Sequence, residues 1–150
     1  MARTMSKVQY KDVVFKVKGY RVQGKQPTFF CVESGNFKLF IDKVGGEAPS
    51  PLEYLLASLA GCFNIVINIM AEEMGISIEN LEIGVEGIFN PEKLYTGKGE
   101  RAGFKEIKVK INIKSEISRD LLEKLIKNVQ DRCPVSDNIT ERTPVTITLG

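Results

Sequence analysis

Three cysteines, Cys31, Cys62 and Cys133, are the side chains of this sequence whose chemistry is most open to a function. They lie 31 and 71 positions apart and form no C-x-x-C pair, so their spacing does not indicate a structural metal site. The 150 residues include no histidine. Ser-His-Asp and Cys-His catalysis, His-ligated zinc and histidine-based acid–base catalysis are therefore excluded within this chain.

Cys62 falls in the middle of a segment that the sequence predicts to be a long helix. It follows Ser50, the predicted N-cap of that helix, by twelve residues, or about 18 Å along the axis. The helix dipole cannot activate a thiol there, because its effect fades within the first turn. Judged by residue type alone, Cys62 is better explained as a packing residue, since free cysteine is among the most buried side chains.

The other two cysteines are also placed by their neighbours. Cys133 comes four residues after Val129 and continues the apolar face of a second predicted helix, which we expect to pack on the first. Cys62 and Cys133 could be close enough to form a disulfide, or could be two buried thiols facing one core. The spacing in the sequence does not distinguish these interpretations. Cys31, beside Phe30 and Val32, is expected to be a core residue.

Two weaker signals do not indicate a function. The glycines at 97, 99 and 103 have the wrong spacing for a dinucleotide-binding loop. The lysines between 105 and 114 are expected on the solvated face of a strand. With a net charge of +2, the chain lacks the basic stripe typical of nucleic-acid binding, so we expect no nucleic-acid partner.

The length and the hydrophobic pattern predict one α+β domain over residues 1–150. The first 45 residues predict an antiparallel meander, with strands over 13–17, 28–32 and 37–41. Two half-buried strands follow at 81–89 and 107–113, joined by a polar connection over 90–103. A helix is predicted from Ser118 to Arg132, ended by Pro134, and a closing strand over 145–149.

The long helix carries the clearest local signals in the sequence. Ser50 as N-cap, Pro51 at the first helical position and Glu53 three residues after the cap form a capping box, and Gly75 is the expected stop. Residues 54–71 carry no charge, but their flanks are acidic, so we predict a buried helix and no membrane association.

The same helix predicts a homodimer. Apolar side chains occupy nearly every side of it, whereas one chain offers too few elements to cover them all. A second copy would supply the missing cover about a two-fold axis. The N-terminal residues show no apolar run typical of a signal peptide, so a cytoplasmic location is expected.

Residues 50–62, which read SPLEYLLASLAGC, followed by Cys133-Pro134-Val135-Ser136, closely resemble the OsmC/Ohr family of osmotically inducible and organic-hydroperoxide-resistance proteins. The order of elements is similar from about residue 8 to the end. The resemblance implies an OsmC-like fold, in which antiparallel sheets pack around two central helices in an intertwined dimer. It also implies a thiol-dependent peroxidase that reduces organic hydroperoxides or hydrogen peroxide at the dimer interface.

Matched residue by residue, Cys62 corresponds to the peroxidatic cysteine of the family and Cys133 to the resolving cysteine. No metal or other cofactor is implied, but an external dithiol, small or protein-bound, is expected as reductant. Arg21 is the candidate for the arginine that assists the thiolate. The partner glutamate stands ten residues before the cysteine in the hydroperoxide-resistance branch, where this sequence has Leu52, and Glu53 falls on the opposite side of the helix from Cys62.

A second hypothesis for the same residues belongs to a different functional class. It is a non-catalytic, stress-related dimer that binds a small ligand in an apolar interface pocket, with both cysteines structural. Peroxide consumption by the chain and its loss in Cys62→Ser would separate the two readings.

Overall fold

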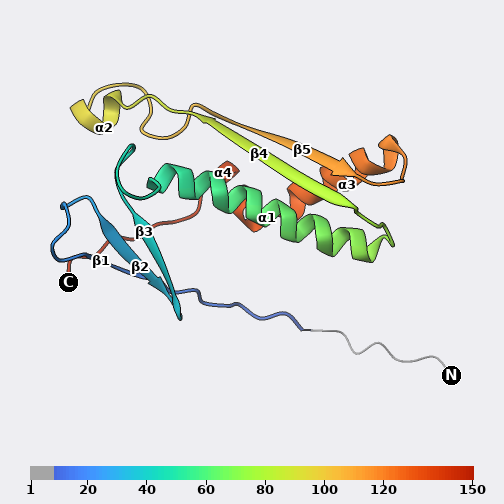
Figure 1. Cartoon of the computed structure of the whole chain (residues 1–150), viewed down its shortest axis with the longest axis horizontal. Coiled ribbons are helices and arrows are strands. Elements are labelled where there is room, and N and C mark those ends of the chain that lie inside the picture. The colour runs from blue at the N-terminus through green and yellow to red at the C-terminus, as the bar shows by residue number, and fades with distance from the viewer. Residues whose placement is uncertain (1–8) are drawn as a thin grey trace. The chain divides into compact units, whose positions relative to one another are not determined.

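The structure is a computed structural model that describes residues 9–150 (Figure 1). It contains antiparallel sheets and helices, which confirms the predicted α+β class. The chain divides into two compact units, one up to Pro51 and one from Leu52 onward, and each is described by itself below.

The first unit is an antiparallel meander of three strands. They are β1 (Lys18–Arg21), β2 (Phe30–Ser34) and β3 (Phe37–Ile41), in the spatial order β1-β2-β3. Gly35, with a φ of 57°, makes the tight turn between β2 and β3, a conformation that favours glycine. An antiparallel meander was expected and two of its predicted strands are confirmed, with β2 beginning two residues later than expected, but its first strand lies at 18–21 and not at 13–17.

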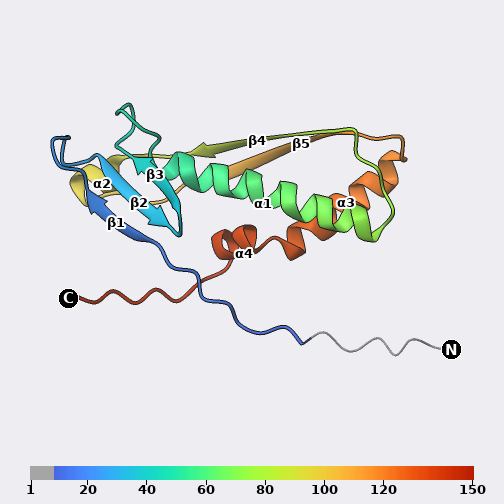
Figure 2. The same ribbon diagram turned by 60° about the horizontal axis from the view of Figure 1, so that its bottom comes forward.

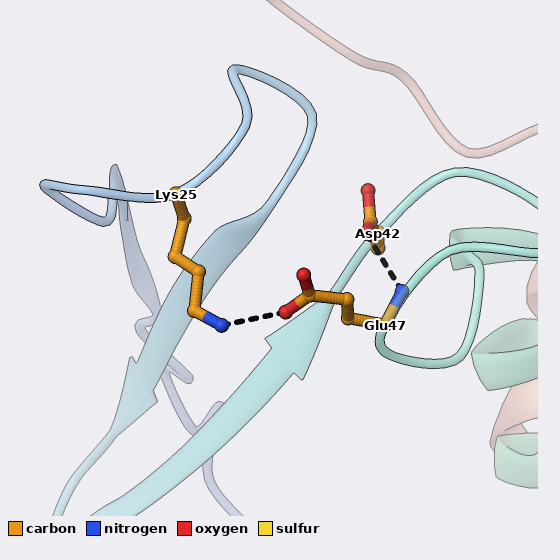
Figure 3. A network of polar contacts seen from close by, with 3 residues as sticks. All are labelled: Lys25, Asp42 and Glu47. Carbon is orange, nitrogen blue, oxygen red and sulfur yellow. Dashed lines mark hydrogen bonds and ion pairs between the residues drawn. The ribbon is translucent and has the colours of Figure 1, made fainter.

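A loop between β3 and the long helix is closed by polar contacts (Figure 3). The buried Asp42 side chain accepts a hydrogen bond from the Glu47 amide at 2.9 Å, and Lys25 pairs with the Glu47 carboxylate at 2.6 Å. The pKa of Asp42 is lowered, first by a hydrogen bond from Thr28 and then by backbone amides. These contacts fix the course of the chain just before the helix begins.

The second unit contains the remaining elements. They are α1 (Pro51–Glu73, whose first residue ends the first unit), β4 (Asn80–Ile88), α2 (Glu92–Thr96), β5 (Glu106–Lys114), α3 (Arg119–Arg132) and α4 (Pro134–Thr140). The predicted boundaries of α1, β4, β5 and α3 are confirmed to within one or two residues. Ser118 caps α3 by accepting the Leu121 amide, and Gly75, with a φ of 66°, follows the end of α1.

The core of the second unit forms where α1 meets α3 and the β4–β5 hairpin. Ile67 of α1 and Leu125 and Val129 of α3 are completely buried. Alternate residues of β4 and β5 face this cluster, as their apolar–polar alternation predicts. Both views show the long hairpin running alongside α1 (Figures 1 and 2).

Within one chain, α1 is buried on one face only. Ile65 is 60% exposed, Ile69 45% and Leu55 38%, and these three residues lie on one side of the helix at heptad-like spacing. By length and composition alone α1 could cross a membrane. The face of α1 opposite these exposed residues packs in the core of this unit, in line with the prediction of a buried helix.

Four expectations were wrong in detail. Residues 13–17 and 145–149 form no strand, and Phe15 and Ile147 are about nine-tenths exposed. A strand needs a neighbouring strand to bond its amides and carbonyls, and these extended segments have none among the described residues of the chain. The connection over 90–103 contains the short helix α2, and residues 134–140 form α4 where no element was predicted.

Candidate functional site

Cys62 lies on α1 at the border between its buried and exposed faces. Leu59 and Val66, one turn on either side along the helix, are both buried in the core, and Cys62 is half-buried and packs against that core. Toward the other side, the neighbouring apolar residue is the exposed Ile65. The Cys62 thiol is therefore anchored by a rigid helix yet close to the surface of the unit.

Cys133 lies at the bend between α3 and α4. Its extended backbone, with φ −79° and ψ 110°, ends α3 before Pro134, which occupies the first turn of α4. The Cys133 sulfur is the N-cap acceptor of α4 and receives the Ser136 amide at 3.4 Å. The side chain is completely buried, so the bend holds the thiol in one place.

The structure brings these two cysteines together. Both are free thiols, and Cys62 packs against the buried cluster that contains Cys133, near enough for the two side chains to interact. The pKa of Cys133 is raised above its ordinary value, first by burial and then by the contact with Cys62, while the Ser136 amide opposes the shift. The expected packing of Cys133 on the long helix is confirmed, and two neighbouring thiols on facing helices are an arrangement from which a disulfide can form.

A raised pKa of Cys133 has a measurable consequence. We expect the Cys133 thiolate, followed by its ultraviolet absorbance in a Cys31→Ser background, to keep forming above about pH 9, because burial opposes the charged form. In Cys62→Ala the midpoint should move to lower pH, since one cause of the shift is removed. It should stay above that of a solvent-exposed cysteine, since burial remains. An unchanged midpoint in Cys62→Ala would contradict the contact between the two thiols.

A cavity of about 310 Å³ lies in the second unit, lined by sequence neighbours of both cysteines but by neither thiol itself. Leu59 and Phe63, on either side of Cys62 in the chain, line it from α1, and Ser136, the cap partner of Cys133, lines it from α4. The remaining wall is mostly apolar and comes from β5, α3 and α4: Ile107, Val109, Ile111, Ile126, Gln130, Ile139 and Thr140. Such a lining suits an alkyl or aryl group better than a charged one.

The other two residues singled out by sequence lie elsewhere along the chain. Arg21 is the last residue of β1, is exposed, and belongs to the first unit, whereas the cysteine pair belongs to the second. Glu53 is exposed in the first turn of α1. Across residues 9–150 no group of three or more cysteine or carboxylate side chains could hold a metal ion.

Sequence reasoning missed two features around Cys133. The capping of α4 by the Cys133 sulfur had a detectable signal, because a proline directly after a potential cap is typical of a helix start. The ion pair between Arg132, the residue before Cys133, and Glu73 at the end of α1 had none. Its partners are 59 positions apart, so no local pattern joins them.

Comparison with known proteins agrees with this architecture. Residues 44–148 match the family described as OsmC-like protein. The chain is similar to an OsmC-like protein from Mycoplasma pneumoniae, with a TM-score of 0.75, 23% identity, and 88% of this chain and 91% of that one covered. It is also similar to the organic hydroperoxide resistance protein OsmC from Legionella pneumophila, with a TM-score of 0.63, 21% identity, and coverages of 86% and 92%.

A further similar structure is the organic hydroperoxide resistance protein OhrB of Bacillus subtilis, with a TM-score of 0.57, 19% identity, and coverages of 87% and 93%. No curated protein matches the chain. At these identities the similar structures establish the shared fold.

Proposed function

The chain belongs to the OsmC-like protein family, and from this premise we propose that it is a thiol-dependent peroxidase that reduces organic hydroperoxides or hydrogen peroxide. Two similar structures are named organic hydroperoxide resistance proteins, which supports a role related to hydroperoxides. The observation that carries the proposal is the packing of Cys62 against the buried cluster that contains Cys133, which brings the two thiols together. The apolar cavity lined by Leu59, Phe63 and Ser136, sequence neighbours of the two cysteines, favours an organic substrate over hydrogen peroxide.

The reaction proceeds in two steps at these thiols. The Cys62 thiolate attacks the terminal oxygen of ROOH, the O–O bond breaks, and Cys62 sulfenic acid forms while the alkoxide takes a proton and leaves as ROH. The Cys133 sulfur then attacks the Cys62 sulfur, a disulfide forms, and the hydroxyl leaves as water with the proton that Cys133 gives up. An external dithiol reduces the disulfide by exchange and becomes a disulfide itself, so no metal or other cofactor takes part.

Cys62 and Cys133 have separate roles because their surroundings differ. Cys62 is half-buried, so a peroxide can reach it, whereas Cys133 is completely buried and in contact with Cys62. Burial raises the pKa of Cys133 and keeps it a thiol at neutral pH, which protects it from direct oxidation because the thiolate is the reactive form. Cys133 therefore acts second, after Cys62 has been oxidised beside it.

Arg21 and a second copy of the chain complete the proposal. Arg21 assists formation of the Cys62 thiolate through its positive charge, as the family resemblance implies. The exposed apolar side of α1 and the exposed apolar residues near both ends, such as Phe15 and Ile147, fit a homodimer in which the partner covers them. A cytoplasmic location, where reduced dithiols are abundant, suits the need for an external reductant.

Peptide mapping after one equivalent of cumene hydroperoxide tests the proposed reaction. We expect the wild-type chain to yield one intrachain disulfide between Cys62 and Cys133, with Cys31 left as a thiol. In Cys133→Ser, Cys62 should stop at sulfenic acid, trapped by dimedone, or go on to sulfinic acid. Cys31→Ser is the matched control and should form the same disulfide. If Cys62 is oxidised no faster than Cys31, the chain is not a peroxidase of this type.

A further inference from the structure

The ion pair between Arg132 and Glu73 joins the C-terminal ends of two helices. Arg132 is the last residue of α3 and Glu73 the last residue of α1. Nη1 and Nη2 of the guanidinium donate to Oε2 and Oε1 of the carboxylate, at 2.7 Å and 3.0 Å. Exposed ion pairs usually contribute little, but a bidentate arginine–carboxylate pair is the geometry in which they do contribute.

The ion pair is connected to the thiol site through both helices. Arg132 is bonded directly to Cys133, and Glu73 follows Cys62 by eleven residues, or about 16 Å along α1. The bend after α3 is therefore attached to α1 at two separated places, through the two sulfurs and through the ion pair. The ion pair thus restrains the last residue of α3 on α1, in addition to the buried contacts of Leu125 and Val129 earlier in the helix.

The electrostatics of the pair agree with a permanent attachment. The hydrogen bond from Arg132 lowers the pKa of Glu73 below its ordinary value, so the carboxylate stays ionised at neutral pH. Both side chains are about half exposed, at 46% and 54%, so neither is needed to fill the core. Their removal should leave the buried contacts of Leu125 and Val129 in place.

We infer that Arg132 and Glu73 are positioning residues, which hold the bend between α3 and α4 so that the Cys133 sulfur stays against Cys62. Neither residue touches a reacting atom. Their effect is on the effective concentration of one thiol at the other, which falls when the geometry loosens. The expected effect on catalysis rests on the proposed peroxidase function, whereas the positioning of the bend by the ion pair does not.

Equilibration with glutathione tests the positioning of Cys133 at Cys62 without any peroxide. One glutathione disulfide oxidises the two protein thiols to the Cys62–Cys133 disulfide and releases two glutathione molecules. The equilibrium constant, measured in a Cys31→Ser background, reports the effective concentration of the thiols. We expect Glu73→Gln to lower it by about threefold to tenfold. Arg132→Lys keeps the positive charge but not the bidentate hydrogen bonds of the guanidinium, and should lower the equilibrium constant less.

Two controls separate positioning from general weakening. Glu79→Gln removes an exposed ion pair of 3.0 Å with Lys114 in the same unit, near the start of α3 and not at its end, and should leave the constant unchanged. The exchanged pair E73R/R132E should restore it to within about twofold of the parent. The inference is overturned if Glu73→Gln leaves the constant unchanged, or if Glu79→Gln lowers it equally.

Kinetics with cumene hydroperoxide then test the consequence for catalysis. In Glu73→Gln the formation of sulfenic acid at Cys62 should keep its wild-type rate, and only the second step, disulfide formation, should slow by a similar factor. If both steps slow together, the pair supports the fold in general and the inference is wrong. If wild-type Cys62 is not oxidised at all, the proposed function fails, while the glutathione equilibrium still decides the inference.

Discussion

Replacing Cys62 by serine is expected to lower the second-order rate of organic hydroperoxide consumption by at least about a thousandfold. The serine hydroxyl has nearly the same size as the thiol but is not ionised at neutral pH, so it cannot attack the O–O bond. The helix around residue 62 should be undisturbed, because the position is only half-buried. Consumption is measured by the loss of cumene hydroperoxide in the presence of excess dithiol.

The third cysteine provides the matched control for this experiment. Cys31 is 2% exposed on β2, in the first unit, and should tolerate the same cysteine-to-serine change without loss of peroxide consumption. If Cys62→Ser consumes peroxide as fast as the wild type, Cys62 is not the attacking thiol. If none of the proteins, wild type included, consumes peroxide, the alternative of a ligand-binding dimer with structural cysteines gains support.

The second large effect is expected in the state of association. Sedimentation equilibrium at low micromolar concentration should give a species of twice the 16.7 kDa chain mass. Ile65→Glu places a charge on the exposed apolar side of α1 and should raise the Kd of the dimer by at least about a hundredfold. A charge cannot be buried in an apolar interface without a partner. Loss of the dimer should also remove peroxide consumption, if the partner completes the site.

A substitution of equal charge elsewhere controls for the added glutamate. Asn128 is exposed on α3 and is not part of the exposed apolar side of α1, so Asn128→Glu should leave the association unchanged. A wild-type chain that sediments at 16.7 kDa and keeps its helix content would show that α1 needs no partner. The proposed dimer, and a site completed by the partner, would then be wrong.

The elements that could be predicted from the sequence are those determined by local signals. The β4 and β5 strands follow from strict alternation of apolar and polar residues, and α3 follows from the cap Ser118 and the spacing of Leu125 and Val129. The short helices α2 and α4 were missed because each has fewer than eight residues, too few for a periodic pattern to emerge. For α4, the proline after Cys133 both ends α3 and begins the next helix, and only the first of these is evident from the sequence of α3.

Two other strand predictions failed, because local composition does not show whether a segment has a partner strand. The segments over 13–17 and 145–149 have strand-like compositions, yet nothing in the described chain pairs with them. The same holds for the site. The sequence placed both cysteines on elements that pack together, but their contact and the Arg132–Glu73 pair depend on how two helices cross, which no local pattern specifies.

The contact between thiols 71 positions apart also has a consequence for conformational stability. A covalent bond between Cys62 and Cys133 would close nearly half of the chain into a loop and lower the conformational entropy of the unfolded state. In the chain-entropy description a loop of that length raises the free energy of unfolding by about 4 kcal/mol. In the proposed cycle the oxidised protein is therefore the form more resistant to heat and to proteases, and each reduction returns the chain to its less stable state.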